Sequence, residues 1–326
     1  MRTTHRTLFI MGILAAVIVF ALIAAGCGGT TTYKIGITQI VAHPALDATA
    51  EGFIEALAKA GFVEGKNVTY DRQNAQGDMA NATTIAQKFV GDKVDLIFSI
   101  ATPTSQAAVK ATTTIPIVFG AVTDPVAAGL VENAEAPEAN VTGVSDMLPV
   151  QPHLDLIKQL VPNVKTIGLL YNAGEANSVS LVEKEKAAAE AMGLKVVEAT
   201  VATSSEVLAA AQSLVGRCDA ISVLTDNTVV SAFESVVKVC QDNKIPLIAG
   251  DIDSVKRGAV AAYAFDYKDH GFQAGQVAAK VLQGTKISKI PVEFAQNLQL
   301  AINQAAATAM GVTIPEDLKA KANTTF

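Results

Sequence analysis

Four short polar segments stand where apolar, β-rich runs of the sequence end. They are Thr102-Pro103, Thr123-Asp124-Pro125, Asn172 to Glu175, and Thr225 to Thr228. Hydroxyl, amide and carboxylate groups at such positions can cap the following helix or hydrogen-bond a small ligand. Capping is the simpler interpretation for any one segment. Because four occur at the expected carboxyl edge of the strands, we interpret them together as the lining of a polar cleft.

Patterns that would indicate catalysis are missing. The segment 61–66 is one residue short of a phosphate-binding loop and is followed by Asn67 instead of Ser or Thr. No glycine-rich dinucleotide motif follows a strand, and no nucleophile elbow is present. His43, His153 and His270 lie far apart in the sequence, and no metal-site spacing occurs. We therefore expect no enzyme activity, no cofactor and no metal.

The elements that must position the polar segments alternate between strands and helices in two successive series. The first has strands at 33–40, 67–73, 95–100 and 115–120, with helices at 45–61, 78–90 and 102–113. The second has strands at 166–171, 195–201, 220–224, 245–249 and 259–263, with helices at 178–193, 204–215 and 228–243. This rhythm predicts an α/β fold of two doubly wound parallel-sheet lobes joined by a hinge near 143–152. A single extended sheet is the less common alternative.

The N-terminal segment has the features of a secretory signal. Arg2, His5 and Arg6 precede an uncharged run that ends in Ala-Gly before Cys27. This order resembles a bacterial lipobox, in which the cysteine is acylated and becomes the new N-terminus. We therefore expect a signal peptide at 1–26 and a lipidated tether at 27–32. A permanent transmembrane helix is the alternative, since the run is long enough to span a bilayer.

Composition narrows the choice of partners. The net charge is −6, the pI is about 5.3, and no run of Lys and Arg occurs. Nucleic acid is therefore not an expected partner. Cys218 and Cys240 flank one predicted strand–helix unit, and an exported protein could join them as a disulfide. We favour two buried thiols, with the disulfide left open.

Several segments together resemble the ABC-transporter substrate-binding lipoproteins whose characterised members take up aromatic amino acids such as tryptophan. The resemblance covers nearly all of the mature chain. It is carried by segments 43–47 (HPALD), 70–78 (YDRQNAQGD), 100–103 (IATP), 121–125 (AVTDP), 141–146 (VTGVSD), 175–178 (EANS), 225–228 (TDNT) and 249–251 (AGD).

The resemblance implies a type I periplasmic-binding fold, in which two lobes joined by three crossovers close around a ligand. Lobe 1 would comprise 33–145, with 267–290 returning to it. Lobe 2 would comprise 146–266, with 291–326 added.

It also implies a set of ligand-binding residues at the matching positions. Thr102 and Thr123 would hold the carboxylate of an amino acid. Asp226 would pair with its ammonium, with Asp251 as second choice and Asp124 as a helix cap. The remaining polar contacts would come from Ser145, Asn177, Ser178 and Asn227, and Gln39 and His43 would lie under the ligand side chain.

These observations predict an extracytoplasmic solute-binding component of an ABC importer, held to the membrane by a lipid on Cys27. We expect a monomer whose partners are an amino acid and a membrane permease. An aromatic or large apolar L-amino acid is favoured. Because the chain has no Trp, phenylalanine, tyrosine and branched aliphatic amino acids stay open beside tryptophan. The alternatives are a ligand-sensing receptor domain and an extracytoplasmic enzyme.

Overall fold

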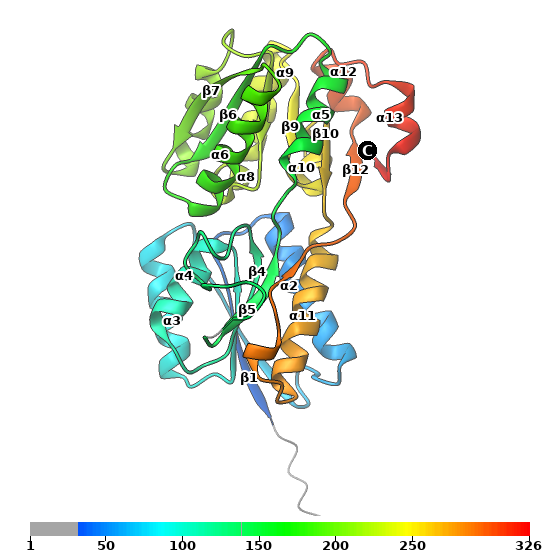
Figure 1. The fold of residues 1–326 in the computed structure, drawn as a ribbon. Helices are drawn as coiled ribbons and strands as arrows, with labels where there is room; N and C mark the ends of the chain where they lie inside the picture. Colours follow the sequence, from blue (N-terminus) through cyan, green and yellow to red (C-terminus); the bar gives the residue numbers. More distant parts are fainter. Residues whose placement is uncertain (1–31, 138) are drawn as a thin grey trace, which may run out of the picture.

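The structure, a computed structural model, describes residues 32–137 and 139–326. Two α/β lobes are stacked end to end (Figure 1). Each has its own hydrophobic core. The predicted signal peptide, Cys27 and nearly all of the tether lie outside the described residues.

The first lobe contains a six-stranded parallel sheet in the order β11-β5-β4-β3-β1-β2. Its strands are β1 (Tyr33–Gln39), β2 (Val68–Asn74), β3 (Leu96–Ile100), β4 (Ile117–Val122), β5 (Val141–Ser145) and β11 (Glu293–Phe294). Every residue of β3, β4 and β5 is buried. Helices on both faces explain why these strands are continuously apolar and do not alternate with polar residues.

Four helices cover this sheet, two on each face (Figure 1). One pair is α3 (Met79–Gly91) and α4 (Thr102–Ala111), and the other is α2 (Pro44–Lys59) and α11 (Tyr267–Leu282). The returning segment 267–282 therefore packs in the first lobe, against α2.

Glycines allow α2 and α11 to approach each other closely. A Cβ atom on Gly52 would lie 2.0 Å from the carbonyl oxygen of Lys268, and one on Gly271 would lie 2.0 Å from that of Thr49. These distances are far inside van der Waals contact, so any larger residue would push the helices apart. The α2–α11 pair is thus a rigid wall of the first lobe.

The second lobe contains a seven-stranded sheet in the order β13-β12-β10-β9-β8-β6-β7. Its strands are β6 (Thr166–Asn172), β7 (Lys195–Val201), β8 (Ala220–Val223), β9 (Leu247–Ala249), β10 (Ala261–Ala264), β12 (Gln299–Ile302) and β13 (Thr324–Thr325). Its helices are α5 (Val150–Leu160), α6 (Ala176–Ala191), η1 (Ser204–Glu206), α7 (Val207–Ser213), α8 (Asn227–Ser231), α9 (Phe233–Asn243), α10 (Ile252–Lys256), α12 (Gln304–Ala309) and α13 (Glu316–Lys321). The sheet is not wholly parallel, because β12 runs antiparallel to β10.

Three segments cross between the lobes, at 146–149, 265–266 and 295–298. The last follows β11, which pairs with β5 after the short helix η2 (Ile287–Lys289). Residues 291–326 are therefore divided between the lobes, whereas the sequence suggested the second lobe alone. The lobe boundary within the first crossing falls in the expected hinge region.

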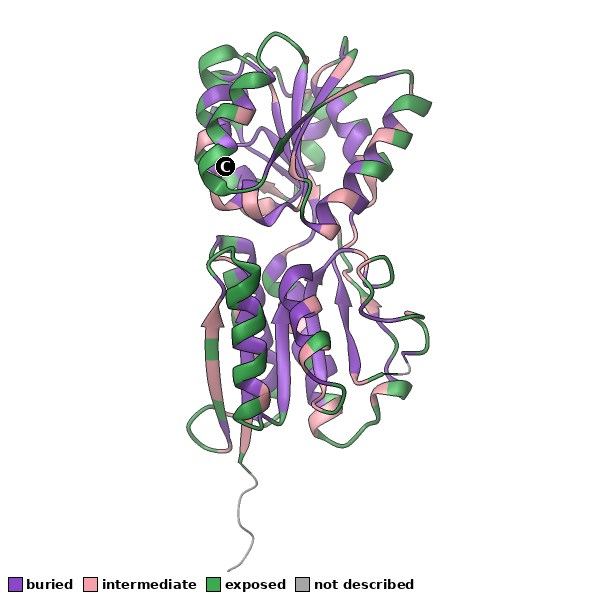
Figure 2. Ribbon diagram, turned by 90° about the vertical axis from the view of Figure 1, so that its left-hand side faces the viewer, coloured by how far each residue is buried: buried purple, intermediate pink, exposed green. Residues whose placement is uncertain are grey.

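Burial follows the layered design, with buried strands at the centre of each lobe and exposed outer helix faces (Figure 2). Cys218 and Cys240 are both free thiols, and Cys240 is fully buried in the second core. Among the described residues, no helix combines the length and apolar character needed to cross a membrane.

Two helix starts differ from the sequence expectation. Ala101, and not Thr102, is the N-cap of α4, so the Thr102 hydroxyl is not a cap. A turn, and not a helix, follows Asp124, whose Oδ1 accepts a hydrogen bond from the backbone N–H of Ala127 at 3.0 Å. Both side chains are thereby left with atoms for other contacts.

The close contact of α2 and α11 can be tested by adding one methyl group. Gly271→Ala should lower the free energy of unfolding by about 1–3 kcal/mol, because its Cβ would overlap the Thr49 carbonyl. The control is Gly91→Ala in α3, where nothing lies within 4 Å of the new Cβ. That variant should be unchanged or more stable by up to about 1 kcal/mol. Equal effects in urea unfolding would contradict the packing argument.

Candidate ligand site between the lobes

The carboxyl ends of the strands of both sheets face one cavity between the lobes. The first lobe lines it with His43, Ala45, Leu46, Ala121, Asp146 and Tyr267, and the second with Asn177, Thr225, Asp226, Asn227, Val230 and Asp251. Its volume of about 20 Å³ is room for about one water molecule. An amino acid is larger, so the lobes or their side chains must move apart to admit one.

A groove of about 540 Å³ lies beside this cavity and is also lined by both lobes. The first lobe contributes residues at the starts of α3 and α4, and the second contributes residues at the starts of α6 and α8. Asn227 lines both spaces. The groove is therefore the natural route from solvent to the cavity.

The structure brings five of the ten predicted binding residues to the cavity. These are His43, Asn177, Asp226, Asn227 and Asp251. The other five, Gln39, Thr102, Thr123, Ser145 and Ser178, are absent from its lining. Ligand contact by all ten stays a prediction.

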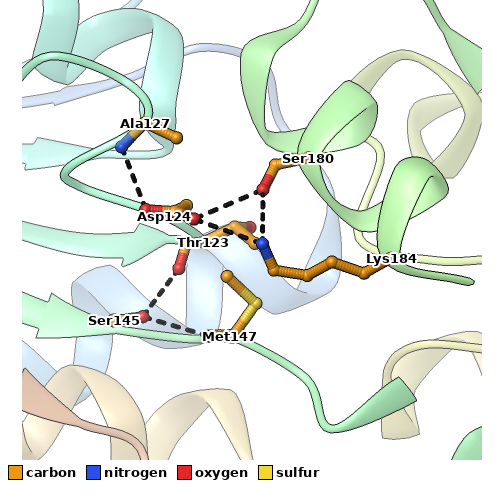
Figure 3. Close-up of polar contacts among 7 residues, drawn as sticks. All are labelled: Thr123, Asp124, Ala127, Ser145, Met147, Ser180 and Lys184. Carbon is orange, nitrogen blue, oxygen red and sulfur yellow. Dashed lines mark hydrogen bonds and ion pairs between the residues drawn. The ribbon is translucent and has the colours of Figure 1, made fainter. Parts of the chain in front are cut away.

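Four of the five residues outside the lining already bond to their own lobe, and one of them, Ser178, donates to Asp226 at 2.6 Å. Gln39 donates to the carbonyl of Val41 and to Asp47. Ser145 donates to the carbonyl of Thr123 at 2.8 Å (Figure 3), and Thr123 donates to Asp146 at 3.1 Å. Thr123 and Ser145 thus fix the ends of β4 and β5, which differs from the ligand contact expected of them.

Asp226 is the N-cap of α8 and lies at the end of β8. Its carboxylate accepts hydrogen bonds from the N–H of Asn172 at 2.6 Å, the N–H of Val229 at 2.7 Å and the hydroxyl of Ser178 at 2.6 Å. Burial raises the pKa of Asp226 to about 7, and the nearby carboxylate of Glu175 adds to the shift. A cation in the cavity would favour the charged form, so the site suits an ammonium group.

Two further buried acids line the cavity, Asp251 from the second lobe and Asp146 from the first. Asp251 caps α10 through the N–H and hydroxyl of Ser254. Asp146 accepts hydrogen bonds from Thr123 and from the hydroxyl of Tyr267 at 2.6 Å. Burial raises the pKa of both carboxyls.

Asp146 and Tyr267 were not predicted as site residues, whereas Glu175 and Thr225 belong to segments predicted to line the cleft but were not named as ligand contacts. Asp146 directly follows β5, so the rule applied to the other strand ends would have found it if β5 had been recognised. Glu175 accepts hydrogen bonds from Asn227 and from the N–H and hydroxyl of Thr228. It holds the start of α8 beside Asp226.

Several cavity atoms are buried and lack a hydrogen-bond partner in the described part of the chain. They are both ring nitrogens of His43, Oδ1 of Asn177 and Oγ1 of Thr225. The hydroxyl of Thr102, at the start of α4, is in the same condition. Since a buried unpaired polar group costs about 1–3 kcal/mol, these atoms mark positions where a polar ligand would be stabilised.

Two alanines at the strand ends of the first lobe have strained backbones. Ala101 follows β3 with φ of 80°, and Ala121 in β4 has φ of 54°. Positive φ is costly for residues other than glycine and clusters at binding sites. The N–H of Ala121 donates to Nε2 of His270 at 2.8 Å, which holds this bend in place.

Asp124 connects the lobes on the side of α4 and α6, as Figure 3 shows. Its Oδ2 lies 3.4 Å from the hydroxyl of Ser180 and 3.5 Å from Nζ of Lys184, both on α6. Lys184 is half exposed, so this ion pair contributes at most about 1 kcal/mol. Asp124 was expected to be only a cap, but it also bridges the lobes.

A second small cavity lies behind the site, inside the second lobe, and shares Thr225 and Asp226 with it. It is lined by the carboxyl group of Glu185, a residue that is 1% exposed. His153 Nε2 lies 2.8 Å from the hydroxyl of Ser222 and 3.6 Å from Glu185. Burial raises the pKa of Glu185 to about 7.

A two-lobed α/β molecule with a polar site at the strand ends between the lobes belongs to the class with the type I periplasmic-binding fold. The match to a family model is more specific. Residues 34–326 match the family described as ABC transporter substrate binding protein. The chain belongs to this family, whose members work outside the cytoplasm.

Known relatives are similar over most of the chain. A protein named tyrosine-binding protein from Clostridioides difficile (strain R20291) is 46% identical over 277 residues, which is 85% of this chain and 80% of that protein. The structure of an ABC domain in complex with L-Trp from Streptococcus pneumonia is 37% identical, with a TM-score of 0.88 over 91% of this chain and 100% of the other.

The ligand-free, open structure of a substrate-binding protein with adhesive properties from Clostridium difficile is 45% identical, covering 90% of this chain and 99% of that one. Its TM-score is only 0.69. The structure described here therefore superposes better on the tryptophan complex than on this open structure, although the sequence of the latter is more similar.

The buried Glu185 should make stability depend on pH. Its folded pKa of about 7 lies above the unfolded value, so the folded state holds more protons between pH 5 and pH 7 and loses stability as pH rises. Glu185→Gln removes this loss. Relative to wild type, the variant should gain stability with rising pH, by at most about 1.4 kcal/mol per pH unit.

The matched control for this measurement is Glu183→Gln, an exposed carboxylate on the same helix. Its stability difference from wild type should stay constant across the same range. Urea unfolding of the three proteins at pH 5 and pH 8 makes the comparison. A pH-independent difference for Glu185→Gln would contradict the burial argument.

Proposed function

We propose that this chain is the extracytoplasmic binding subunit of an ABC importer and captures an aromatic L-amino acid between its lobes, with tyrosine first. The observation that carries the proposal is one cavity between the lobes that combines buried acids, an apolar patch on the first lobe and unpaired buried polar atoms. The names of the tyrosine-binding relative and of the tryptophan complex support the same class of ligand.

The ammonium group of the ligand would pair with Asp226. This carboxylate is almost fully buried, and three protein donors orient it. Oδ1 accepts only one hydrogen bond, from Val229, and so has room for another donor. Asp251 lies on the same wall and would add to the negative potential.

The carboxylate group would bind at the start of α4. Thr102 offers a buried, unpaired hydroxyl there, and the first turn of a ten-residue helix presents free N–H groups. The strained backbone of Ala101 sets the direction in which these groups point. A zwitterion would therefore touch the first lobe with one charged group and the second lobe with the other.

Contact with both lobes explains how binding is signalled to a transporter. A ligand that pairs the unpaired atoms of both walls favours the closed arrangement over the open one by its difference in binding energy. A permease that docks on the closed arrangement would then receive only loaded protein. No catalytic step is part of this role.

The position of β1 fits a tethered protein. The start of this strand lies at the end of the first lobe that is remote from the second lobe (Figure 1). A tether ending at an acylated Cys27 would thus attach far from the cleft and leave it free to open. The permease partner and the lipid anchor are parts of this proposal.

An aromatic amino acid should stabilise the purified protein against heat. L-tyrosine at one hundred times its Kd adds about 2.7 kcal/mol of stability, which should raise the Tm by several degrees. Tryptophan and phenylalanine are compared in the same screen, with sugars and dicarboxylates beside them. A Tm that rises only with solutes lacking an amino group would refute the proposed ligand class.

Asp226→Asn tests the ammonium contact in the same protein. It keeps the shape and the cap but removes the charge, so the Kd should rise about 10- to 100-fold in calorimetry. The control is Asp266→Asn, which alters the N-cap of α11 in the same way but lies outside the cavity lining. Equal affinity losses in the two variants would move the ammonium elsewhere.

Acylation of Cys27 can be tested by membrane fractionation. Expressed in a bacterial host, wild-type protein should incorporate labelled palmitate and sediment with membranes, because the Ala-Gly-Cys sequence would direct diacylation of the thiol. Cys27→Ala should lose the label, and Cys218→Ala is the matched control that should keep it. Equal labelling of all three proteins would contradict the lipid anchor.

A further inference from the structure

His43 is buried at the cavity without a hydrogen-bond partner. It lies between β1 and α2, is 7% exposed, and occupies the N-cap position of α2 without making a capping hydrogen bond. Neither Nδ1 nor Nε2 has a partner among the described residues. Leaving both atoms unpaired is costly.

The imidazole of His43 is neutral at physiological pH. Burial lowers its pKa to about 3, and the positive charge of Arg257 acts in the same direction. The amide of Asn227 opposes the shift, although it does not meet the geometry of a hydrogen bond to either ring nitrogen. A neutral imidazole offers one N–H donor and one acceptor nitrogen. It therefore suits a neutral polar group better than a charged one.

The two walls of the cavity differ in character, which orients an amino acid inside it. The second-lobe wall is polar, with Asp226 and Asp251 among five polar residues and Val230. The first-lobe side combines an apolar patch of Ala45, Leu46 and Ala121 with the polar residues His43, Asp146 and Tyr267. With the ammonium paired to Asp226 on the second lobe, the ligand's side chain would point toward the first lobe, where His43 lies beside the apolar patch at the start of α2.

We infer that His43 accepts a hydrogen bond from the side chain of the bound amino acid, and thereby selects a ring that carries a donor, above all the tyrosine phenol, over phenylalanine. This inference rests on the proposed function and names the residue that distinguishes one ligand side chain from another. Phenylalanine would bury its ring in the same place and leave the imidazole unpaired. A site with a buried hydrogen-bonding group binds a ligand that cannot pair this group less tightly, because the protein group then stays unsatisfied.

The inference predicts a pattern across two ligands and three proteins. In wild type, L-tyrosine should bind at least about tenfold more tightly than L-phenylalanine. His43→Leu should weaken tyrosine binding about tenfold, while phenylalanine binding changes less than about threefold. His43→Gln restores a donor and an acceptor at this position and should recover part of the preference for tyrosine. Calorimetry measures all six Kd values.

Each outcome decides between head-group and side-chain contact. Because phenylalanine and tyrosine share the same amino and carboxylate groups, a loss of folding or of head-group binding would weaken both ligands equally. Equal weakening by His43→Leu, or equal affinities in wild type, would overturn the inference and leave the proposed function standing. If the wild-type protein bound no aromatic amino acid, the proposed function would fail, and this inference with it.

Discussion

Buried polar atoms that the protein itself does not pair are the constraint on which the arrangement of the two lobes depends. In the described part of the chain, His43 from one lobe and Asn177 and Thr225 from the other contribute such atoms to one cavity. Each unpaired atom costs free energy in a closed cleft but can bond to water in an open one. A partner that bonds to both walls would therefore stabilise the closed arrangement. The chemistry of the site and the motion of the lobes follow from the same atoms.

This coupling requires that each lobe stay rigid while the segments between them bend. In the first lobe, the backbones of α2 and α11 are in direct contact at Gly52 and Gly271, so the two helices are held together as one rigid unit. The start of α2 carries His43 and the start of α11 carries Tyr267, so both cavity residues move with that wall. Direct side-chain bonds between the lobes are few and weak, with Asp124 to Ser180 and Lys184 the clearest case among the described residues. Because these bonds contribute little energy, binding of a ligand would decide the equilibrium between the open and closed arrangements of the lobes.

Sequence patterns predicted the fold well where an element is local and strongly apolar. The strands that end at Ile100 and Val223, and the polar residues behind them, could be found because buried parallel strands read as continuous apolar runs. The short strand β5 (VTGVS) has no such run, and with it Asp146 was missed. The antiparallel strand β12 was also missed, because only the three-dimensional return of the chain sets its partner.

The site residues were predictable by position but not by role. The family resemblance named ten residues, of which five line the cavity. It could not tell a free hydroxyl from a bonded one. The Thr102 hydroxyl is unpaired because Ala101, and not Thr102, is the N-cap of α4, whereas the Thr123 hydroxyl donates to Asp146. Such differences depend on single hydrogen bonds across strands, which no spacing in the sequence records.

The charges around the cavity decide which solutes can close the cleft. Asp146, Asp226 and Asp251 are buried together. The guanidinium of Arg257 donates hydrogen bonds to Glu234 at 2.7 and 2.8 Å, so this carboxylate offsets much of its positive charge. Negative charge on a solute would raise the cost of ionising these acids further. In the proposed function, a solute with an ammonium group lowers the cost of ionising Asp226, while the apolar patch and His43 act on the ligand's side chain. The proposed contacts then have to be made on both lobes before the cleft closes.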